Sequence, residues 1–449
     1  METKKKGFPT AFWICACTEI FERLAYYLGR SLILIFVTAS VATGGLGLSD
    51  TVAANMQSNL TAFSYLLPLF GAVIVDKYIG ARYTTPVGMF IAAAGYFTGG
   101  IAKSSAGVYA MIFLVSLGLA LFKNGAIIGR VITDKSQMDP AFSMRYTLVN
   151  VGAFIGTFLV GILYKDVFAK DGVLGFAPCF KMAALMMVLG GLWYIFVCWR
   201  FLGDLGKLPF KKTLTEEEKA AEAKKKEETG TKQPLTTIEK KRIGAIFVAS
   251  LFSIVFWIFW YLGYMPVYFY WAENMDWVVA GYQVPSTWFD AANSLFCVIL
   301  GPVTAALWKK LAARPQGDMS LFRKTGLGIA IIGVGYLFYA AIDIMRGGEK
   351  ASVLWLIVFA FLLTMGEMFF SPLGHSFISK YSPSRYLAVM MSVWGFATFI
   401  AAKSYGPVYG LLFGGKIEFK VACIGVAVVS FAAALIMIAL DKKLSALVD

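Results

Sequence analysis

Histidine, charged residues and metal-binding patterns are scarce in this sequence. The 449-residue chain has one histidine, His375, and Asp, Glu, Lys and Arg together make up only 15% of it. Its six cysteines lie in or beside apolar segments, without the spacing of a metal site or a disulfide framework. Since no nucleophile–base arrangement, phosphate-binding loop or metal cluster is recognisable, we expect neither an enzyme nor a resident cofactor.

Apolar residues dominate instead. They make up 58% of the chain, and the mean hydropathy is +0.69, values outside those of a soluble globular domain. Apolar runs of about 20 residues, the length that crosses a bilayer as a helix, are centred near residues 28, 64, 93, 118, 152, 188, 255, 298, 332, 365, 399 and 430. We therefore expect an all-α membrane protein with twelve transmembrane helices. The basic N-terminus meets Glu19 early and lacks a clean cleavage site, so we expect a retained first helix and not a signal peptide.

Lys and Arg are unevenly distributed between the two sides of these helices. The side that includes both termini collects 29 of the 41 basic residues, and the other side collects 7. Because basic loops stay in the cytoplasm, we expect a multi-pass protein of the plasma (inner) membrane with both termini cytoplasmic. The formal charge of +14 follows largely from this asymmetry. It suits contact with anionic lipid and gives no reason to expect nucleic-acid binding.

One segment, residues 203–240, interrupts the apolar pattern. Its charges come in alternating blocks and it has almost no large apolar side chains, so we expect a solvated cytoplasmic linker. It separates an N-terminal six-helix bundle, residues 1–202, from a C-terminal six-helix bundle, residues 241–449. Two such halves with both ends in the cytoplasm are the layout of a major-facilitator transporter, whose halves rock about a site at the membrane midplane.

Ionisable side chains inside the apolar segments are the main candidates for function. At about 100° per residue, polar side chains of the first helix form one stripe, which consists of Glu19, Glu22, Arg23, Tyr26, Tyr27 and Arg30. A charge that faces lipid costs at least a few kcal/mol, so we expect this stripe to face the interior of the bundle. Other apolar segments contribute Lys123, Asp290, Glu367 and Lys403. A structural role in helix packing stays open for the stripe, and for Asp290 and Lys403 it is as good an interpretation as a functional one.

Several motifs resemble those of the proton-coupled oligopeptide transporter (POT) family. The ExxER of Glu19, Glu22 and Arg23, followed by two tyrosines and Arg30, is similar to the family's signature on the first helix. Segments similar to further family motifs follow in order along most of the chain: YLLPLFGAVIVDKYIGAR (65–82), LFKNGAIIG (121–129), NVGAF (150–154), NSLFCVILGP (293–302), GEMFFSPLGHSFISKYSP (366–383) and MMSVWGF (390–396). The resemblance implies the major-facilitator fold and proton-driven import of di- and tripeptides by alternating access.

The resemblance also implies roles for individual residues. Those implied in proton coupling are Glu19, Glu22, Arg23 and Lys123. Those implied in peptide binding are Tyr27, Arg30, Tyr65, Lys123, Asn150, Asn293, Glu367, Ser371 and Trp394. The charges suit both roles. Glu22 beside Arg23 can alternate between an ion pair and a free protonated acid, while Arg30 and Lys123 suit a peptide carboxylate and Glu367 its ammonium group.

Departures from the family pattern leave the substrate open. Tyr261 and Leu262 stand where the family usually has a Glu-Gln pair, Asn124 is followed by glycine where proline is frequent, and His375 replaces a common aliphatic residue. The linker 203–240 is also too short and too charged for the two extra helices of many bacterial relatives. Two alternatives therefore remain: a proton-coupled symporter of another small solute, such as an amino acid, nitrate or an organic anion, and a membrane protein that binds its ligand without transporting it. We expect the partners to be a short peptide or related solute, protons and membrane lipids, and the protein to function as a monomer.

Overall fold

The computed structural model describes residues 7–448 apart from 135–136, 210–234, 316, 318, 371–376, 379–380 and 384–385. Helices make up nearly all of its regular structure, and the strands in this part of the chain have two residues each. The predicted all-α class is confirmed. The chain divides into two compact units, of which the first is Met1–Leu48 with Leu66–Leu214 and the second is Ser49–Tyr65 with Thr215–Asp449.

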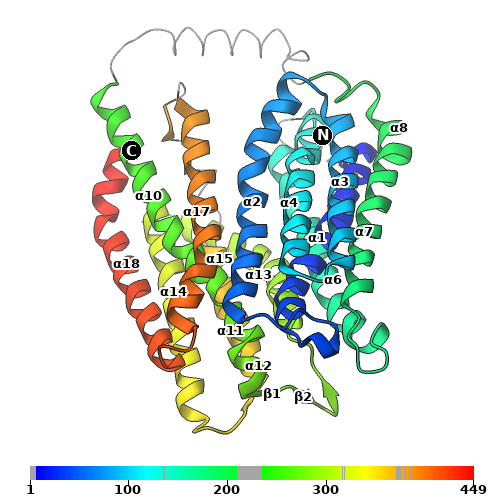
Figure 1. Ribbon diagram of the computed structural model, residues 1–449. Helices are drawn as coiled ribbons and strands as arrows, with labels where there is room; N and C mark the ends of the chain where they lie inside the picture. The colour runs from blue at the N-terminus through cyan, green and yellow to red at the C-terminus, as the bar shows by residue number, and fades with distance from the viewer. Residues whose placement is uncertain are drawn as a thin grey trace. The chain divides into compact units, whose positions relative to one another are not determined.

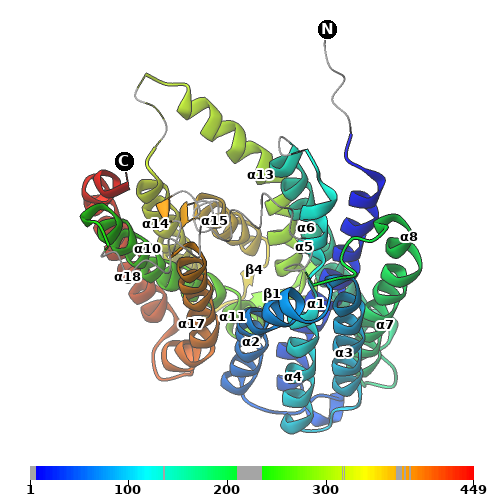
Figure 2. The same ribbon diagram turned by 90° about the horizontal axis from the view of Figure 1, so that it is seen from above.

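The first unit is a bundle of long helices with short helical segments between them. The long helices are α1 (Thr10–Thr38), the C-terminal part of α2 (Asp50–Lys77), α3 (Ala81–Ile101), α4 (Ser105–Leu121), α6 (Met138–Ile162) and α7 (Phe176–Trp193). The short ones are η1 (Val41–Thr43), α5 (Asn124–Val131), η3 (Leu163–Val167), η4 (Tyr194–Cys198) and α8 (Trp199–Leu202). Helix α1 packs against α6 and α7, and α3 packs against α4 and α7, as the two views in Figures 1 and 2 show.

Two glycines allow α6 to lie close to α1. A Cβ atom on Gly156 would collide with the backbone carbonyl of Leu24, and one on Gly152 would lie 2.8 Å from the carbonyl oxygen of Ile20. A larger residue at either position would push the two helices apart. Because α1 carries the polar stripe, its close approach to α6 determines which α6 side chains can reach that stripe.

The second unit has six long helices in its described part and a small β structure. The helices are α10 (Thr237–Leu262), α13 (Trp288–Ala312), α14 (Leu321–Met345), α15 (Trp355–Phe370), α17 (Leu387–Phe413) and α18 (Phe419–Val448), with α11 (Met265–Tyr268) and α12 (Tyr270–Asn274) as short segments. Strand β1 (Met275–Asp276) pairs in parallel with β4 (Ala351–Ser352), and β2 (Val278–Val279) pairs antiparallel with β3 (Tyr282–Gln283). Helix α14 packs on α15 and α18, and α10 packs on α17 and α18.

Helix α2 belongs to both units. Its residues up to Tyr65 are part of the second unit, and those from Leu66 onward are part of the first. Pro68 lies three residues beyond this boundary, inside the helix. A proline inside a helix removes one backbone hydrogen bond and crowds the preceding turn, so α2 is intrinsically weakened near the point where it passes from one unit to the other.

Arg82 holds the end of the last helix of the first unit. Its guanidinium donates hydrogen bonds to the carbonyl oxygens of Gly203 and, at 2.7 Å, Trp199, and it lies 5.2 Å from the centre of the Trp199 ring. The Trp199 indole N–H in turn donates to the Arg82 carbonyl at 3.2 Å. These contacts satisfy carbonyl groups at the C-terminal end of α8 that have no partner within the helix.

A capping box defines the beginning of α10. The backbone N–H of Glu239 donates to the Thr236 hydroxyl at 3.2 Å, and the backbone N–H of Thr236 donates to the Glu239 carboxylate at 2.9 Å. The predicted linker, residues 203–240, begins directly after α8, and its residues 210–234 are outside the described part of the chain. Its predicted end is wrong by a few residues, because the capping box starts α10 at Thr237.

Eight helical stretches within the described residues are long and apolar enough to cross a membrane. They are Asp50–Val75, Ser105–Val131, Pro140–Val167, Phe176–Leu202, Thr237–Asn274, Trp288–Ala312, Leu321–Met345 and Phe419–Ala446, and the shorter helix Trp355–Phe370 is also apolar. Helix α1 has the length but not the composition, because it carries the four charges of Glu19, Glu22, Arg23 and Arg30. Repeated apolar spans of this length identify an integral membrane protein.

Substitution of Gly156 by alanine tests the close packing of α1 on α6. We expect Gly156→Ala to lower the free energy of unfolding by about 1 to 3 kcal/mol, since the added methyl group has no room beside the Leu24 carbonyl. The matched control is Gly425→Ala in α18, where a Cβ atom would meet nothing within 4 Å. There the alanine should leave stability unchanged or raise it slightly, because alanine is the better helix former. Thermal unfolding of both purified variants in detergent gives the comparison, and equal shifts would contradict the packing argument.

Candidate functional site

The first cluster of ionisable groups is built on α1 and is almost closed to solvent. Glu22 is fully buried, and Glu19 and Arg30 are only 2% and 4% exposed. Arg23 donates two hydrogen bonds to the Glu22 carboxylate, one of them from Nη2 at 2.6 Å, and its guanidinium lies 4.9 Å from the centre of the Tyr26 ring. Neighbours in a helix point in different directions, so the Arg23 side chain must fold back along the helix to make this bidentate pair. The two charges thereby compensate each other inside an apolar surrounding.

Glu19 is held by side chains from two other helices. Arg145 of α6 donates to its carboxylate at 3.0 Å, and Asn124 at the beginning of α5 donates to the same oxygen at 3.1 Å. The Asn124 amide also donates to the Cys15 carbonyl at 2.8 Å. These bonds join α1, α5 and α6 around one buried carboxylate. Arg145 has no signal of its own in the sequence, because the charge bias alone accounts for a basic residue near the polar end of a helix.

Lys123 lies where helical geometry is interrupted. Helix α4 ends at Leu121 and α5 begins at Asn124, and Lys123 between them has φ −120° and ψ 30°. Its backbone N–H donates to the Thr85 hydroxyl at 3.4 Å. Its ammonium donates to the carbonyl oxygen of Pro68 in α2 at 2.8 Å. The resemblance implied Lys123 in proton coupling together with Glu19 and Glu22, whereas the hydrogen bonds described above for these two carboxylates come from Arg145, Asn124 and Arg23.

Two further predicted residues lie on α1 and α6. The Tyr27 ring packs edge to face with Tyr26, with 5.4 Å between the ring centres. The Asn150 amide donates to the Tyr146 carbonyl, one turn earlier in its own helix, at 3.0 Å. All the predicted residues of the first unit therefore fall on α1, on the interruption between α4 and α5, and on α6.

The second unit has its own buried carboxylate, Glu367 of α15. The Asn293 amide of α13 donates to the Glu367 carboxylate at 3.3 Å and to the Thr364 hydroxyl at 2.8 Å. The Cys297 thiol, one turn further along α13, lies 3.7 Å from the same carboxylate oxygen. Two predicted residues, Asn293 and Glu367, are thus in direct contact. The described donors to Glu367 are neutral, which distinguishes it from the carboxylates of α1.

The remaining predicted residues lie around α17 and the N-terminal part of α2. Trp394 stacks on Phe370 at 6.5 Å between ring centres. The Tyr65 hydroxyl accepts a hydrogen bond from Tyr261 at 3.2 Å, and the Tyr261 ring stacks on Tyr405 with 5.0 Å between centres. Tyr261, which departs from the family pattern, is therefore part of a tyrosine cluster. Two residues singled out from the sequence, Ser371 and His375, lie outside the described residues.

Asp290 and Lys403 both have polar partners within the second unit. The Tyr268 hydroxyl donates to the Asp290 carboxylate, and the Lys403 ammonium donates to the side-chain oxygen of Asn59 in α2. Both contacts are compatible with the structural role that the sequence left open for these two residues.

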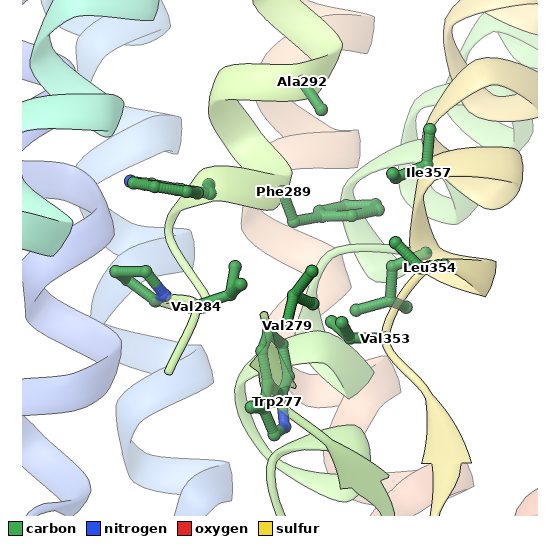
Figure 3. Close-up of a pocket in the computed structure, with 11 residues that line it drawn as sticks. Trp277, Val279, Val284, Phe289, Ala292, Val353, Leu354 and Ile357 are labelled. Atoms are coloured by element: carbon green, nitrogen blue, oxygen red, sulfur yellow. The ribbon is translucent and has the colours of Figure 1, made fainter. Parts of the chain in front are cut away.

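An apolar pocket of about 320 Å³ lies in the second unit, away from the predicted site residues. Figure 3 shows Trp277 and Phe289 on its walls, together with side chains from the first turns of α13 and α15. The residues that line it are Trp277, Val279, Val284, Pro285, Trp288, Phe289, Ala292, Val353, Leu354, Leu356 and Ile357. With no charged group on its walls, this pocket does not suit a zwitterion. Among the described residues there is also no group of three or more His, Cys, Asp and Glu that could hold a metal ion.

Comparisons with known proteins agree on one family. The family model of the POT family matches residues 205–413. The uncharacterized transporter YclF of Bacillus subtilis (strain 168) is 25% identical over 439 residues, which cover 89% of this chain and 87% of that protein. The di-/tripeptide transporter of Lactococcus lactis subsp. cremoris is 24% identical over 441 residues, which cover 86% of each protein.

Solved structures of transporters share the fold. A POT family transporter in complex with 5-aminolevulinic acid has a TM-score of 0.85 at 23% identity, with 98% of both chains covered. A peptide transporter POT in complex with sulfate has a TM-score of 0.86 at 23% identity, with 99% of this chain and 97% of that chain covered. The chain therefore has the fold of these transporters along nearly its whole length.

A double-mutant cycle on Glu19→Gln and Arg145→Gln measures whether the buried pair holds α1 to α6. We expect a coupling of about 1 to 3 kcal/mol in the free energy of unfolding, because either single change leaves a charge without its partner. The control cycle uses the surface pair of Lys207 and Asp204, which are 2.7 Å apart. There the hydrogen bond from Lys207 lowers the pKa of the exposed Asp204 carboxyl. This pair should give much weaker coupling because water screens it. Coupling no larger than that of the surface pair would contradict a structural role for Arg145.

Proposed function

We propose that the chain is a member of the POT family, whose model matches residues 205–413, and that it is a proton-driven symporter that imports di- and tripeptides by alternating access. The observation that carries the proposal is the buried group of Glu19, Glu22 and Arg23 on α1, since two carboxylates next to a guanidinium in an apolar helix provide a site for exchangeable protons. Relatives named di-/tripeptide transporters support the substrate class. The proposed protein is a transporter and not an enzyme. Its coupling ion would be the proton.

The proposed protein spans the plasma (inner) membrane twelve times, as two six-helix bundles. The eight apolar spans support this, and α1, α3, α15 and α17 would supply the other four. The excess of Lys and Arg on one side of the sequence supports cytoplasmic termini. In this arrangement the protein would function as a monomer in contact with membrane lipids.

Proton coupling would depend on the pair of Glu22 and Arg23. When Glu22 is ionised, the bidentate contact with Arg23 satisfies both charges. When Glu22 takes up a proton, it no longer needs the guanidinium, and Arg23 becomes available to another anion. Glu19 is bonded to Arg145 and Asn124, so the release of its contacts would separate α1 from α5 and α6. Of the two carboxylates, Glu22 is therefore the better candidate for the proton carrier.

Substrate recognition would use opposite charges at the two ends of the peptide. Arg30 and Lys123 in the first unit suit the carboxylate, with the guanidinium able to form two parallel hydrogen bonds. Glu367 in the second unit suits the ammonium, and its neutral neighbours Asn293 and Cys297 leave its negative charge without a compensating cation among the contacts described. Tyr27, Tyr65, Asn150, Ser371 and Trp394 would complete the peptide site.

A symporter of another small solute, such as an amino acid, nitrate or an organic anion, is the second candidate. It is favoured by Tyr261, which stands at a position of the usual Glu-Gln pair and donates to Tyr65, itself a candidate for the binding site. A tyrosine hydroxyl keeps its proton near neutral pH, so it cannot release and take up a proton there as a carboxylate can. A ligand-binding protein that does not transport is a third possibility, which uptake measurements separate from both.

Replacement of Glu22 by glutamine tests proton coupling. Glu22→Gln should abolish peptide accumulation driven by a pH gradient while counterflow exchange persists, because glutamine keeps the shape and hydrogen bonding but cannot carry the proton. Uptake of labelled alanylalanine into proteoliposomes measures both activities. Glu349→Gln, a change at an exposed carboxylate of a loop, is the control and should behave like the unmodified protein. If Glu22→Gln still accumulates peptide against its gradient, the coupling assignment is wrong.

Replacement of Glu367 by glutamine tests peptide recognition. Glu367→Gln should weaken binding of alanylalanine far more than binding of its N-acetylated form, since only the free amine loses a charge-assisted hydrogen bond of about 1.5 to 3 kcal/mol. Calorimetry on purified protein measures both affinities. Asp441→Asn removes a buried carboxylate that contacts Ser320 and Arg323 instead, and it should not alter the ratio of the two affinities. An unchanged ratio in Glu367→Gln would move the second candidate ahead.

A further inference from the structure

The N-terminal half of α2 is hydrogen-bonded to α17 within the second unit. The Ser58 hydroxyl lies 2.7 Å from the carbonyl of Ala402 and 3.0 Å from that of Lys403. The Tyr405 hydroxyl donates to the Gln57 side chain at 3.2 Å and lies 3.2 Å from the hydroxyl of Thr61. Polar contacts of residues 57–61, about one turn of the helix, therefore bind this half of α2 to α17.

The C-terminal half of α2 packs closely against α4 within the first unit. A Cβ atom on Gly71 would collide with the backbone carbonyl of Ala120, near the C-terminal end of α4. The two helices are thus in backbone contact just before the interruption that contains Lys123. Each half of α2 is therefore held in a different compact unit, and residues 65–71 connect the two halves.

Pro68 and Lys123 meet in this interval. Pro68 has no N–H to offer the carbonyl of Ser64, one turn earlier, so the helix lacks one of its own hydrogen bonds there. The Lys123 ammonium donates at 2.8 Å to the carbonyl of Pro68 itself. A charged donor to this carbonyl fixes the weakest turn of α2 to the interruption between α4 and α5.

We propose that Lys123 is a positioning residue for α2. Its ammonium holds the Pro68 carbonyl in the absence of substrate and releases it when a substrate carboxylate binds to Lys123. The inference rests on the proposed function, because it takes the incoming group to be the carboxylate of a peptide. Glu19 and Glu22 are already bonded to Arg145 and Arg23, so neither depends on Lys123 for compensation. The Lys123 ammonium gains a Coulombic attraction from an ionised carboxylate that the neutral carbonyl of Pro68 does not offer, and a carboxylate therefore displaces Pro68. Released from Lys123, α2 becomes flexible at the boundary between the two units.

Hydrogen–deuterium exchange of the full-length protein in detergent tests the contact without any ligand. Lys123→Met should raise the exchange of amides 69–72 of α2 roughly tenfold, equivalent to about 1.4 kcal/mol. Lys103→Met, at an exposed lysine of the same unit, is the matched control and should leave these amides unchanged. Equal exchange in the unmodified protein and in Lys123→Met overturns the proposal. Monodisperse elution shows that each variant is folded.

A second variant and a peptide probe complete the experiment. Pro68→Ala keeps the carbonyl but restores the missing N–H, so it should slow amide exchange at residues 69–72. It should also slow peptide uptake, although alanylalanine still binds. Unchanged exchange would contradict flexibility of α2 at Pro68. Saturating alanylalanine should bring the unmodified protein toward the exchange of Lys123→Met and leave that variant unaffected. If alanylalanine binds without this change, release by substrate is wrong. If alanylalanine does not bind, the proposed substrate class is wrong. The exchange of Lys123→Met and of the unmodified protein, compared without peptide, still decides whether Lys123 holds α2.

Discussion

The free-energy cost of a charge in an apolar interior is the constraint on which the first unit depends. Each ionised group of α1 must meet an opposite charge or several hydrogen-bond donors before the helix can be buried. Glu22 meets Arg23 on its own helix, whereas Glu19 accepts hydrogen bonds from side chains of α5 and α6. The burial of α1 therefore requires Arg145 and Asn124 in place. Gly152 and Gly156 serve the same end, because they let α6 approach closely enough for Arg145 to reach Glu19.

Glu367 of the second unit differs from the buried carboxylates of α1. In the first unit, the hydrogen bonds to Glu19 and Glu22 include those of guanidinium groups, so the negative charges are compensated within the unit. In the second unit, Glu367 is bonded to the Asn293 amide and approached by the Cys297 thiol, which are neutral. Hydrogen bonds from neutral groups stabilise a carboxylate less than a salt bridge does. This difference is what a carrier of a zwitterion needs, since a cation of the ligand gains most where the protein supplies none.

Much of this could be predicted from single segments of sequence. The all-α class follows from the apolar runs, and the burial of the α1 stripe follows from the angular spacing of Glu19, Glu22 and Arg30 along one helix. The contact of Asn293 with Glu367 was not predicted as a hydrogen bond, although both residues were selected for the same site. Local patterns cannot indicate which helix lies opposite a given side chain. Lys123 was identified as ionisable and intramembrane, but its bond to Pro68 depends on the packing of α2 against α4.

Other features had no local signal at all. Arg145 could not be separated from the basic residues that the charge bias explains, because its meaning comes from Glu19, more than a hundred positions earlier. The division of α2 between two units is equally invisible, since its sequence is a continuous apolar helix with one proline. Only the contacts of its two halves, with α17 and with α4, reveal that one helix serves both units.

The capping box of Thr236 and Glu239 has a consequence for how such a chain can change over evolution. It fixes the first residue of α10, and with it the rotational phase of every side chain that follows, from within four residues of sequence. At the other end of the linker, Arg82 at the beginning of α3, more than a hundred residues earlier, holds the carbonyls of Trp199 and Gly203. Insertions and deletions between these two points leave the helical phase on both sides untouched. The linker can thus vary in length, or acquire targeting and regulatory sequences, independently of the transmembrane helices.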